Sequence, residues 1–543
     1  MNRSSFLLAA AMPFAIQAAQ AAEPAKNAKS AARENQRPNI LCIVCEDISP
    51  YLGCYGDPVA RTPNLDAFAR QGVRYTNMYT TVGVSSPSRF ALITGMYPSA
   101  LGANNMRTGA YKGTYDGKPV SGYQAVPPAG VKCYTEYLRA AGYYCANNSK
   151  TDYQFAAPKT AWDDNGNKAH WKNAPEGMPF MAIFNLGSTH ESQLWKSIDK
   201  PLAVNPADIV VPPYLVDDHV TRKGLAVMYS NIYRMDEESA ALLAELEESG
   251  KAGNTIVIWY SDNGGPIPRG KREIYQTGAN VPFMIRYPDG RGAGSVERRM
   301  SMFVDIPATI LSLCGIAPPE YMHGKAFAGK YDAPEREYVY GARDRFDEAQ
   351  ATDKQGAVCD GRYRYVRNYM PQRSDWLDNK YQLQIPFMKS MRQLHFEGKL
   401  NADQEKWFSA PRPGEEFYDL QSDPYELHNL IDKKTSKPHI ERLRKEYDKW
   451  IAEYNSMWML PEEELYAQFY PGGEPQKVAD PSGKVSDGVL SLSCHTLGAS
   501  MAYRLNGKGR WLLYTAPVPV GQGNTIEAVA CRAGFAESAT VSL

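Results

Sequence analysis

The run Pro38-Asn-Ile-Leu-Cys-Ile-Val-Cys45 is the stretch that decides the fold expected for this chain. It is apolar on both faces, which is typical of a strand buried inside a parallel sheet. Similar runs follow at 180–186 and 255–260, and stretches with helical spacing, such as 62–71, 134–141 and 225–249, alternate with the strands. This alternation predicts an α/β fold with a large, mostly parallel sheet sandwiched by helices.

Polar residues stand directly after three of the predicted strands. The first strand ends in Glu46-Asp47, the second leads into Ser-Thr-His190-Glu, and the third leads into Ser-Asp262-Asn263. In doubly wound sheets the site lies beyond the carboxyl ends of the strands, so these groups are expected to meet. Their oxygen ligands are of the hard kind that suits calcium or magnesium rather than zinc. The alternative for an acidic pair at a strand end is a helix cap or a surface pair.

The segment Ser85-Ser-Pro-Ser-Arg-Phe-Ala-Leu-Ile-Thr-Gly95 begins with a hydroxyl and continues with helical spacing. A reactive group at a helix N-terminus benefits from free backbone N–H groups and from the helix dipole, which both favour an anion. Arg89 lies one turn later on the same face, where its fork-shaped cation can hold an oxyanion. An ordinary capped helix start has the same general layout.

The full segment also resembles the activation motif of the type I, formylglycine-dependent sulfatases of the alkaline phosphatase superfamily. That motif reads Cys or Ser, any residue, Pro, Ser, Arg, three residues, Leu or a similar residue, Thr, Gly, and Ile93 is the one conservative variation. The resemblance implies that Ser85 is oxidised to formylglycine, whose hydrate attacks the sulfate ester. Because the first residue is Ser, it implies the serine-type, oxygen-independent route and an anaerobic-type sulfatase-maturating enzyme as partner.

The resemblance extends over about residues 38–457 and assigns further roles. It implies one divalent metal, Ca²⁺ in preference to Mg²⁺, and catalytic residues besides the nucleophile. The implied metal ligands are Glu46, Asp47, Ser85, Asp262 and Asn263, and the implied catalytic residues are Ser85, Arg89, Lys150, His190 and Lys271. His190 is the candidate proton donor to the leaving sugar.

Two positions depart from the family pattern. Glu46 stands where the family has Asp, which keeps the charge but lengthens the arm. Asp152 stands where the family has a His two residues after the sulfate-binding Lys, here Lys150. Asp152 is therefore placed among the candidate substrate residues instead of the catalytic ones.

Mixed charges in segments without periodicity predict an outer substrate pocket. In it, Arg would bind an acidic sugar and carboxylates would bind sugar hydroxyls, with Trp195 and Trp376 stacking on sugar rings. The alternative is a solvated charged surface. The candidate substrate residues are Arg107, Asp152, Arg343, Asp344, Arg345 and Glu348.

The first residues of the chain indicate where the protein is located, and the composition indicates which partners are not expected. Residues 1–22 read as a signal peptide and 23–37 as a flexible lead-in, which predicts an exported bacterial protein, periplasmic or extracellular. The 543 residues carry a formal net charge of zero, so no global field favours nucleic acid or an anionic membrane as a partner. The nine Cys residues have no zinc-type spacing, and a bridge between Cys42 and Cys45 is not expected.

Composition and strand spacing change along the chain and predict three structural units. These are a catalytic α/β domain at 38–335, a smaller C-terminal antiparallel α+β subdomain at 336–460 and an appended small β-sandwich at 461–543. The expected function is hydrolysis of sulfate esters on carbohydrates, with a sulfated monosaccharide or oligosaccharide as substrate. The alternatives are a phosphatase or phosphodiesterase of the alkaline phosphatase superfamily, and a catalytically idle, calcium-dependent glycan-binding protein.

Overall fold

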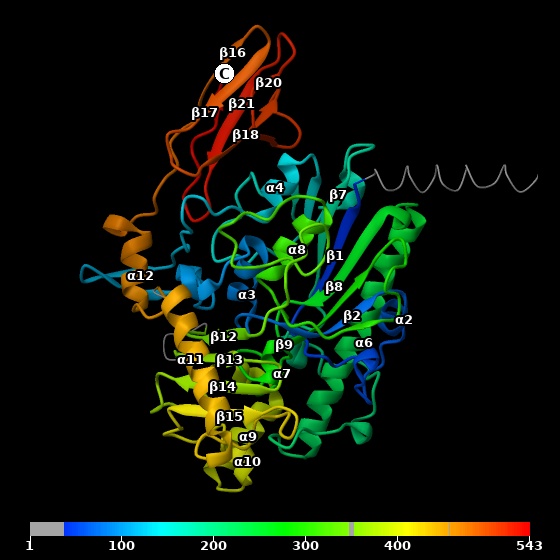
Figure 1. The fold of residues 1–543 in the computed structure, drawn as a ribbon, viewed down its shortest axis with the longest axis vertical. Helices are drawn as coiled ribbons and strands as arrows, with labels where there is room; N and C mark the ends of the chain where they lie inside the picture. The colour runs from blue at the N-terminus through cyan, green and yellow to red at the C-terminus, as the bar shows by residue number, and fades with distance from the viewer. Residues whose placement is uncertain (1–36, 347–351, 456) are drawn as a thin grey trace, which may run out of the picture.

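The computed structural model describes residues 37–346, 352–455 and 457–543 (Figure 1). The predicted signal peptide, the lead-in before Arg37, and Glu348 lie outside the described residues. Within the described residues, no helix is long and apolar enough to cross a membrane. All nine cysteines have free thiols, Cys42 and Cys45 included.

A nine-stranded sheet forms the centre of the molecule, in the order β10-β2-β9-β8-β1-β7-β5-β6 with β11 beside β2 (Figure 1). Strands β8, β1, β7, β5 and β6 are parallel, whereas β9 runs antiparallel to both β2 and β8. The strands span Asn39–Cys45 (β1), Val73–Tyr79 (β2), Tyr144–Asn148 (β5), Asp164–Asn165 (β6), Phe180–Leu186 (β7), Thr255–Ser261 (β8), Asn280–Arg286 (β9), Val296–Glu297 (β10) and Ser301–Met302 (β11).

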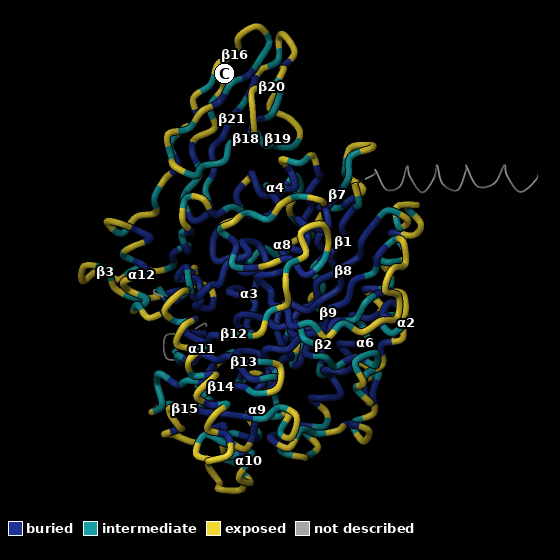
Figure 2. The backbone as a smooth tube through the Cα atoms, in the orientation of Figure 1, coloured by how far each residue is buried: buried dark blue, intermediate teal, exposed yellow. Residues whose placement is uncertain are grey.

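Helices cover both faces of this sheet, as the alternating sequence pattern predicts. Successive residues of β1 show why, since Ile40, Cys42 and Val44 enter one buried cluster while Leu41 and Ile43 enter another. The first cluster includes side chains of α3 (Ser85–Thr94), α4 (Tyr134–Ala140) and α8 (Asp305–Leu313), and the second those of α2 (Pro63–Gln71) and α6 (His219–Glu248). Figure 2 shows the central strands as continuously buried.

A smaller antiparallel sheet follows, in the order β12-β13-β14-β15. Its strands are Val339–Arg343, Gln355–Cys359, Tyr363–Asn368 and Glu415–Asp419, and α11 (Lys437–Tyr454) packs on it through Leu443 and Tyr447. Between β14 and β15 lie α9 (Pro386–Phe396) and α10 (Ala402–Glu405), and α9 packs against α6. Tyr365 of β14 and Phe417 of β15 belong to the same buried cluster as Ile40 of β1, so the small sheet shares the hydrophobic core of the large one.

The C-terminal strands form two small sheets that share a core. One has the order β16-β17-β20 (Ser482–Ser486, Val489–Ser493, Val518–Pro519) and the other β19-β18-β21-β22 (Leu512–Tyr514, Ser500–Leu505, Ile526–Cys531, Val541–Ser542). Leu490 of β17 and Tyr503 and Ala528 of the other sheet belong to one buried cluster. The expected fold class, a large mostly parallel sheet with an antiparallel sheet and a β-sandwich after it, is confirmed.

One segment assigned to the sandwich by sequence packs elsewhere. Helix α12 (Glu462–Phe469) follows the predicted boundary at residue 460, but Leu465 and Phe469 belong to the main core. Tyr466 packs its ring against Tyr123, with 6.1 Å between centroids. The strands of the sandwich begin only at β16.

Candidate active site

The ends of three parallel strands bring the predicted polar groups together. Cys45 at the end of β1 is level with Leu186 of β7 on one side and with Ser261 of β8 on the other. The residues that follow each strand therefore emerge at the same edge of the sheet. Asp47 has a φ of 52°, in the left-handed region, as the chain turns away from β1.

Ser85 lies at the first turn of α3 and faces these strand ends. Its hydroxyl donates to the Oδ1 atom of Asn263 at 3.0 Å, and the residue is buried. The next turn places Arg89 against Asp262, to which its Nε atom donates at 3.0 Å. Its Nη1 atom donates to Asn185 Oδ1 at 2.6 Å, so both ends of the guanidinium are held.

Asp47, Asp262 and Asn263 form a buried group of hard oxygen donors next to Ser85. The Asn263 side chain donates to Asp47 Oδ1 at 2.9 Å, and the Asp47 backbone N–H donates to Asp262 Oδ1 at 3.2 Å. Buried carboxylates need a cation or several donors. This donor set fits a hard divalent cation bound beside the Ser85 hydroxyl.

Three acidic or imidazole groups, Asp47, His190 and Glu191, also lie close enough together to hold a metal. Cations of the protein already occupy that side, because Lys271 Nζ lies 2.7 Å from Asp47 Oδ2 and 3.1 Å from Glu191 Oε1. A metal there would face the Lys271 ammonium at close range. The Asp47, Asp262 and Asn263 group also has a cation beside it, since Arg89 bonds Asp262, but it offers only oxygen donors, which are the ligands that calcium and magnesium prefer.

Glu46 points toward the cationic side of the site. Its Oε2 atom lies 2.6 Å from Lys150 Nζ and 3.7 Å from His190 Nε2. The longer arm of Glu, compared with the Asp of the family pattern, reaches these groups. Its metal-ligand role stays a prediction.

Glu191 and Arg272 hold Lys271 in place. Both oxygens of Glu191 accept from Arg272, at 2.7 and 2.8 Å, and its backbone N–H donates to Asp47 Oδ2 at 2.7 Å. Burial opposes ionisation of Glu191, but Arg272 and Lys271 outweigh it and hold its pKa well below the usual range. Burial acts to lower the pKa of Lys271, but Asp47 and Glu191 raise it above the usual value. This lysine is a fixed cation.

His190 is suited to exchange a proton at the mouth of the site. Its Nδ1 atom lies 2.9 Å from Ser192 Oγ, which orients the ring and leaves Nε2 toward Glu46. Burial, and then Lys271, lower its pKa below the usual value, although Asp47 and Glu46 act in the opposite direction.

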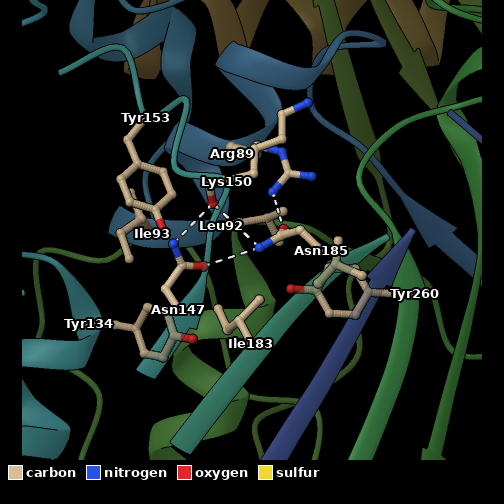
Figure 3. Close-up of a pocket in the computed structure, with 11 residues that line it drawn as sticks. Arg89, Leu92, Ile93, Tyr134, Asn147, Lys150, Tyr153, Ile183, Asn185 and Tyr260 are labelled. Atoms are coloured by element: carbon tan, nitrogen blue, oxygen red, sulfur yellow. Dashed lines mark hydrogen bonds between the residues drawn. The ribbon is translucent and has the colours of Figure 1, made fainter. Parts of the chain in front are cut away.

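A small cavity lies behind the site, beneath Arg89 and Lys150 (Figure 3). Asn147 and Asn185 face each other there, and the Asn185 amide donates to Asn147 Oδ1 at 3.2 Å. The cavity volume of about 20 Å³ has room for roughly one water and none for a sugar. These two Asn residues brace Arg89 and the loop that carries Lys150.

The predicted substrate residues fall into two groups. Arg107 and Asp152 line an open hollow of about 530 Å³ beside the start of α3. Arg343, Asp344 and Arg345 are instead buried side chains. Arg343 pairs with Glu273 and Arg345 with Glu462, so their charges are used inside the protein.

The two tryptophans also differ in position. Trp195 lies 5.2 Å from the ring of Tyr381, which in turn lies 6.5 Å from the His190 ring, so it belongs to the surroundings of the site. Trp376 packs on Trp407 and Phe408. Its aromatic surface is engaged by these two rings.

Sequence reasoning missed four groups that position the site: Glu191, Arg272, Asn185 and Asn147. Each stands within three residues of a polar residue or strand end that sequence reasoning singled out. Their partners lie from about 40 to 140 residues away, as in the contacts of Glu191 with Asp47 and of Asn185 with Asn147. No local pattern marks such pairs.

Comparison with known proteins finds sulfatase family models and sulfatase relatives. A family model described as sulfatase matches residues 38–316, and one described as N-sulphoglucosamine sulphohydrolase, C-terminal, matches residues 269–384. An ulvan-active sulfatase of Formosa agariphila is 39% identical over 94% of this chain and 91% of its own length. The human N-sulphoglucosamine sulphohydrolase is 25% identical over 80% of this chain and 94% of its own length.

Solved structures share the fold at lower identity. A protein in complex with its substrate D-glucosamine-2-N,6-O-disulfate aligns with a TM-score of 0.55 and 17% identity, over 78% of this chain and all of that one. The phosphonate monoester hydrolase of Agrobacterium radiobacter aligns with a TM-score of 0.56 and 15% identity, over 77% of this chain and 96% of its own. The fold alone therefore does not separate sulfatases from phosphonate monoester hydrolases.

Fold, site and sequence comparison together define a sulfuric ester hydrolase. The chain belongs to the sulfatase family, within the alkaline phosphatase superfamily.

Proposed function

We propose that this protein hydrolyses sulfate esters on carbohydrates through a formylglycine made from Ser85. The position of the Ser85 hydroxyl carries the proposal. It lies at the N-terminus of α3, 3.0 Å from Asn263 and beside the buried oxygens of Asp47 and Asp262. A nucleophile there would meet a sulfate group between the hard oxygen donors and the lysines.

The formylglycine hydrate, when present at position 85, supplies the nucleophilic hydroxyl for attack on sulfur. Lys150 and Lys271 contribute positive charge at the same edge of the sheet, where a sulfate ester needs it. Arg89, held by Asp262 and Asn185, adds a third fixed cation one turn after residue 85. These charges are set before substrate arrives, so little reorganisation is needed during reaction.

His190 is the proposed proton donor to the leaving sugar oxygen. Its Nε2 atom faces the site, and Glu46 at 3.7 Å favours the protonated ring. Because burial and Lys271 lower its pKa, the donor form is favoured by slightly acidic conditions or by the arrival of the anionic substrate.

Asp47, Asp262 and Asn263 are the proposed ligands of one calcium ion, with residue 85 beside them and Glu46 at the edge of the set. The buried, all-oxygen donor set supports calcium over a softer metal. Such an ion supplies Lewis-acid polarisation of a sulfate oxygen.

The proposed substrate is a sulfated oligosaccharide of the kind for which the relative from Formosa agariphila is named. The open hollow beside α3 supports a substrate larger than one sugar. Export to the periplasm or beyond, and modification of Ser85 by an anaerobic-type maturating enzyme, complete the proposal.

Mass spectrometry of the Ser85 peptide from the native host tests the proposal directly. A residue two hydrogens lighter than serine, together with sulfate release from sulfated oligosaccharides, is the expected result. Ser85→Ala should abolish sulfate release, whereas Ser85→Cys, the other first residue of the motif, should regain it when a maturating enzyme accepts Cys. Plain serine in fully active protein would overturn the mechanism and favour a phosphatase-type use of Ser85. Calcium-dependent glycan binding without turnover, by native protein that keeps plain serine at position 85, would instead favour the glycan-binding alternative.

A further inference from the structure

The segment 264–275, which follows β8, carries Lys271 in a costly backbone conformation. Arg269 and Arg272, on either side of this lysine, have φ values of 58° and 78°, in the left-handed region. Residues other than glycine adopt this region at a cost and keep it only where surrounding contacts impose it. The position of the Lys271 ammonium therefore depends on the groups that hold this segment.

One side of the segment lies against the turn that precedes Ser85. The Arg272 backbone N–H donates to the Gly83 carbonyl oxygen at 2.5 Å. Glu273 packs on the same glycine, since a Cβ at position 83 would meet the Glu273 carbonyl oxygen at 2.5 Å. Gly83 stands two residues before Ser85. A shift of the segment would therefore move Lys271 relative to Ser85.

The other side of the segment is held by Arg343, the last residue of β12 in the smaller sheet. Its Nη1 atom lies 2.5 Å from Glu273 Oε2, and both side chains are buried. Nη1 also donates to Gln355 Oε1 at 3.1 Å, and Nη2 donates to the Asp375 carbonyl oxygen at 3.0 Å. These contacts keep the guanidinium directed at Glu273.

The charges around this ion pair make Glu273 depend on Arg343. Asp353 and Asp375 lie 3.5 and 3.7 Å from Arg343, and Arg412 pairs with both of them, so three carboxylates share two guanidinium groups. Burial raises the pKa of Glu273 to about 7, with Arg343 acting against it and Asp375 acting with burial. Without Arg343, the Glu273 carboxylate would have to move or take up a proton.

We propose that Arg343 is a positioning residue for Lys271. By binding Glu273 it fixes the segment 264–275, and thereby the distance of the Lys271 ammonium from residue 85. The smaller sheet then contributes to catalysis through this ion pair. The inference rests on the proposed role of Lys271 in holding the charge of the sulfate group, and it names the residue that sets the place of this lysine.

The turnover of Arg343 and Lys271 variants, alone and combined, tests the inference. Arg343→Gln should lower kcat for sulfate release by about 10- to 100-fold and change KM by less than about 3-fold, because a displaced cation loses mainly transition-state contact. In the Lys271→Ala protein, Arg343→Gln should lower kcat by less than about 2-fold further, because both changes act on the same ammonium. Arg343→Lys, which keeps the charge without the fork, should recover part of the lost kcat.

The matched control is Asp305→Asn, which breaks another buried ion pair, that of Asp305 with Arg336 at the start of α8. It should lower the melting temperature but leave kcat unchanged. A wild-type kcat for Arg343→Gln, or a second loss of the same size when it is added to Lys271→Ala, would overturn the inference. If Arg343→Gln does not fold, Glu273→Gln repeats the same comparison from the other side of the pair.

Amide hydrogen exchange of the peptide 264–275 gives a measurement that needs no turnover. Exchange should be faster in Arg343→Gln than in the wild-type protein and in Asp305→Asn. Equal exchange in all three proteins would show that Arg343 does not hold the segment, and the inference would fail. Absence of sulfate release by the wild-type protein would instead count against the sulfatase proposal, so the two failures are distinguishable.

Discussion

Replacing Glu191 by Gln should lower both the melting temperature of the protein and its rate of sulfate release. Glu191 is 1% exposed and neutralises Arg272 and Lys271 at distances of 2.7 to 3.1 Å. The amide of Gln has the same shape but no charge, and its NH₂ group would face donors of these cations. Breaking a buried ion pair by removing one partner costs about 3–5 kcal/mol. At about 2 °C per kcal/mol, the expected fall in melting temperature is roughly 6–10 °C.

The chain offers a matched control on its surface. Asp217 accepts two hydrogen bonds from Arg222, the geometry that Glu191 makes with Arg272, but its side chain is 55% exposed. Asp217→Asn should leave the melting temperature within measurement error, because solvent screens an exposed pair. Thermal unfolding followed by near-UV circular dichroism, with sulfate release measured on the same samples, compares the two variants.

The effect of Glu191→Gln should also depend on pH in a defined direction. Although burial opposes it, Arg272 and Lys271 hold the pKa of Glu191 below its usual value, so its ionised form stabilises the folded state. That contribution is full above the unfolded-state pKa of about 4.5 and disappears as pH falls through the folded-state pKa. The two proteins should therefore differ fully at neutral pH. Equal melting temperatures of Glu191→Gln and wild type at neutral pH would refute the reasoning.

Three further predictions concern other parts of the molecule. Burial, and then Arg336, lower the pKa of His323 to about 4. The free energy of unfolding should therefore fall as pH drops below about 6.5, by roughly 2–3 kcal/mol at about pH 4.5. His323→Asn, whose side chain can still accept a hydrogen bond from the Tyr97 backbone N–H, should flatten this pH dependence in thermal melts. Calcium chelation should lower both sulfate release and melting temperature, with recovery on adding Ca²⁺, and a melting temperature insensitive to chelator and calcium would contradict the metal site. Gly270→Ala should abolish sulfate release, because its Cβ would meet the Gly265 carbonyl oxygen at 2.3 Å and displace Lys271, whereas Gly130→Ala, with open space, should stay active.

Much of this protein could be predicted from short stretches of its sequence. The apolar run at 38–45 predicts the central strand, because a strand buried on both faces needs apolar side chains on both faces. The strand found is Asn39–Cys45. The segment that begins at Ser85 predicts a helix start with a hydroxyl at its N-terminus, and α3 begins at Ser85. These features depend on residue spacing within about ten positions, which a sequence displays directly.

Tertiary structure alone decided the electrostatics of the site and the identity of its supporting residues. Arg343 and Arg107 look alike in sequence, yet one is buried against Glu273 and the other lines an open hollow. Glu191 gained its role from Arg272, Lys271 and Asp47, which lie far from it along the chain. The sequence by itself determined which chemical groups stand at the strand ends. Folding decided which charges were buried against partners and which line a hollow, because burial and partner distance depend on contacts between segments far apart in the chain.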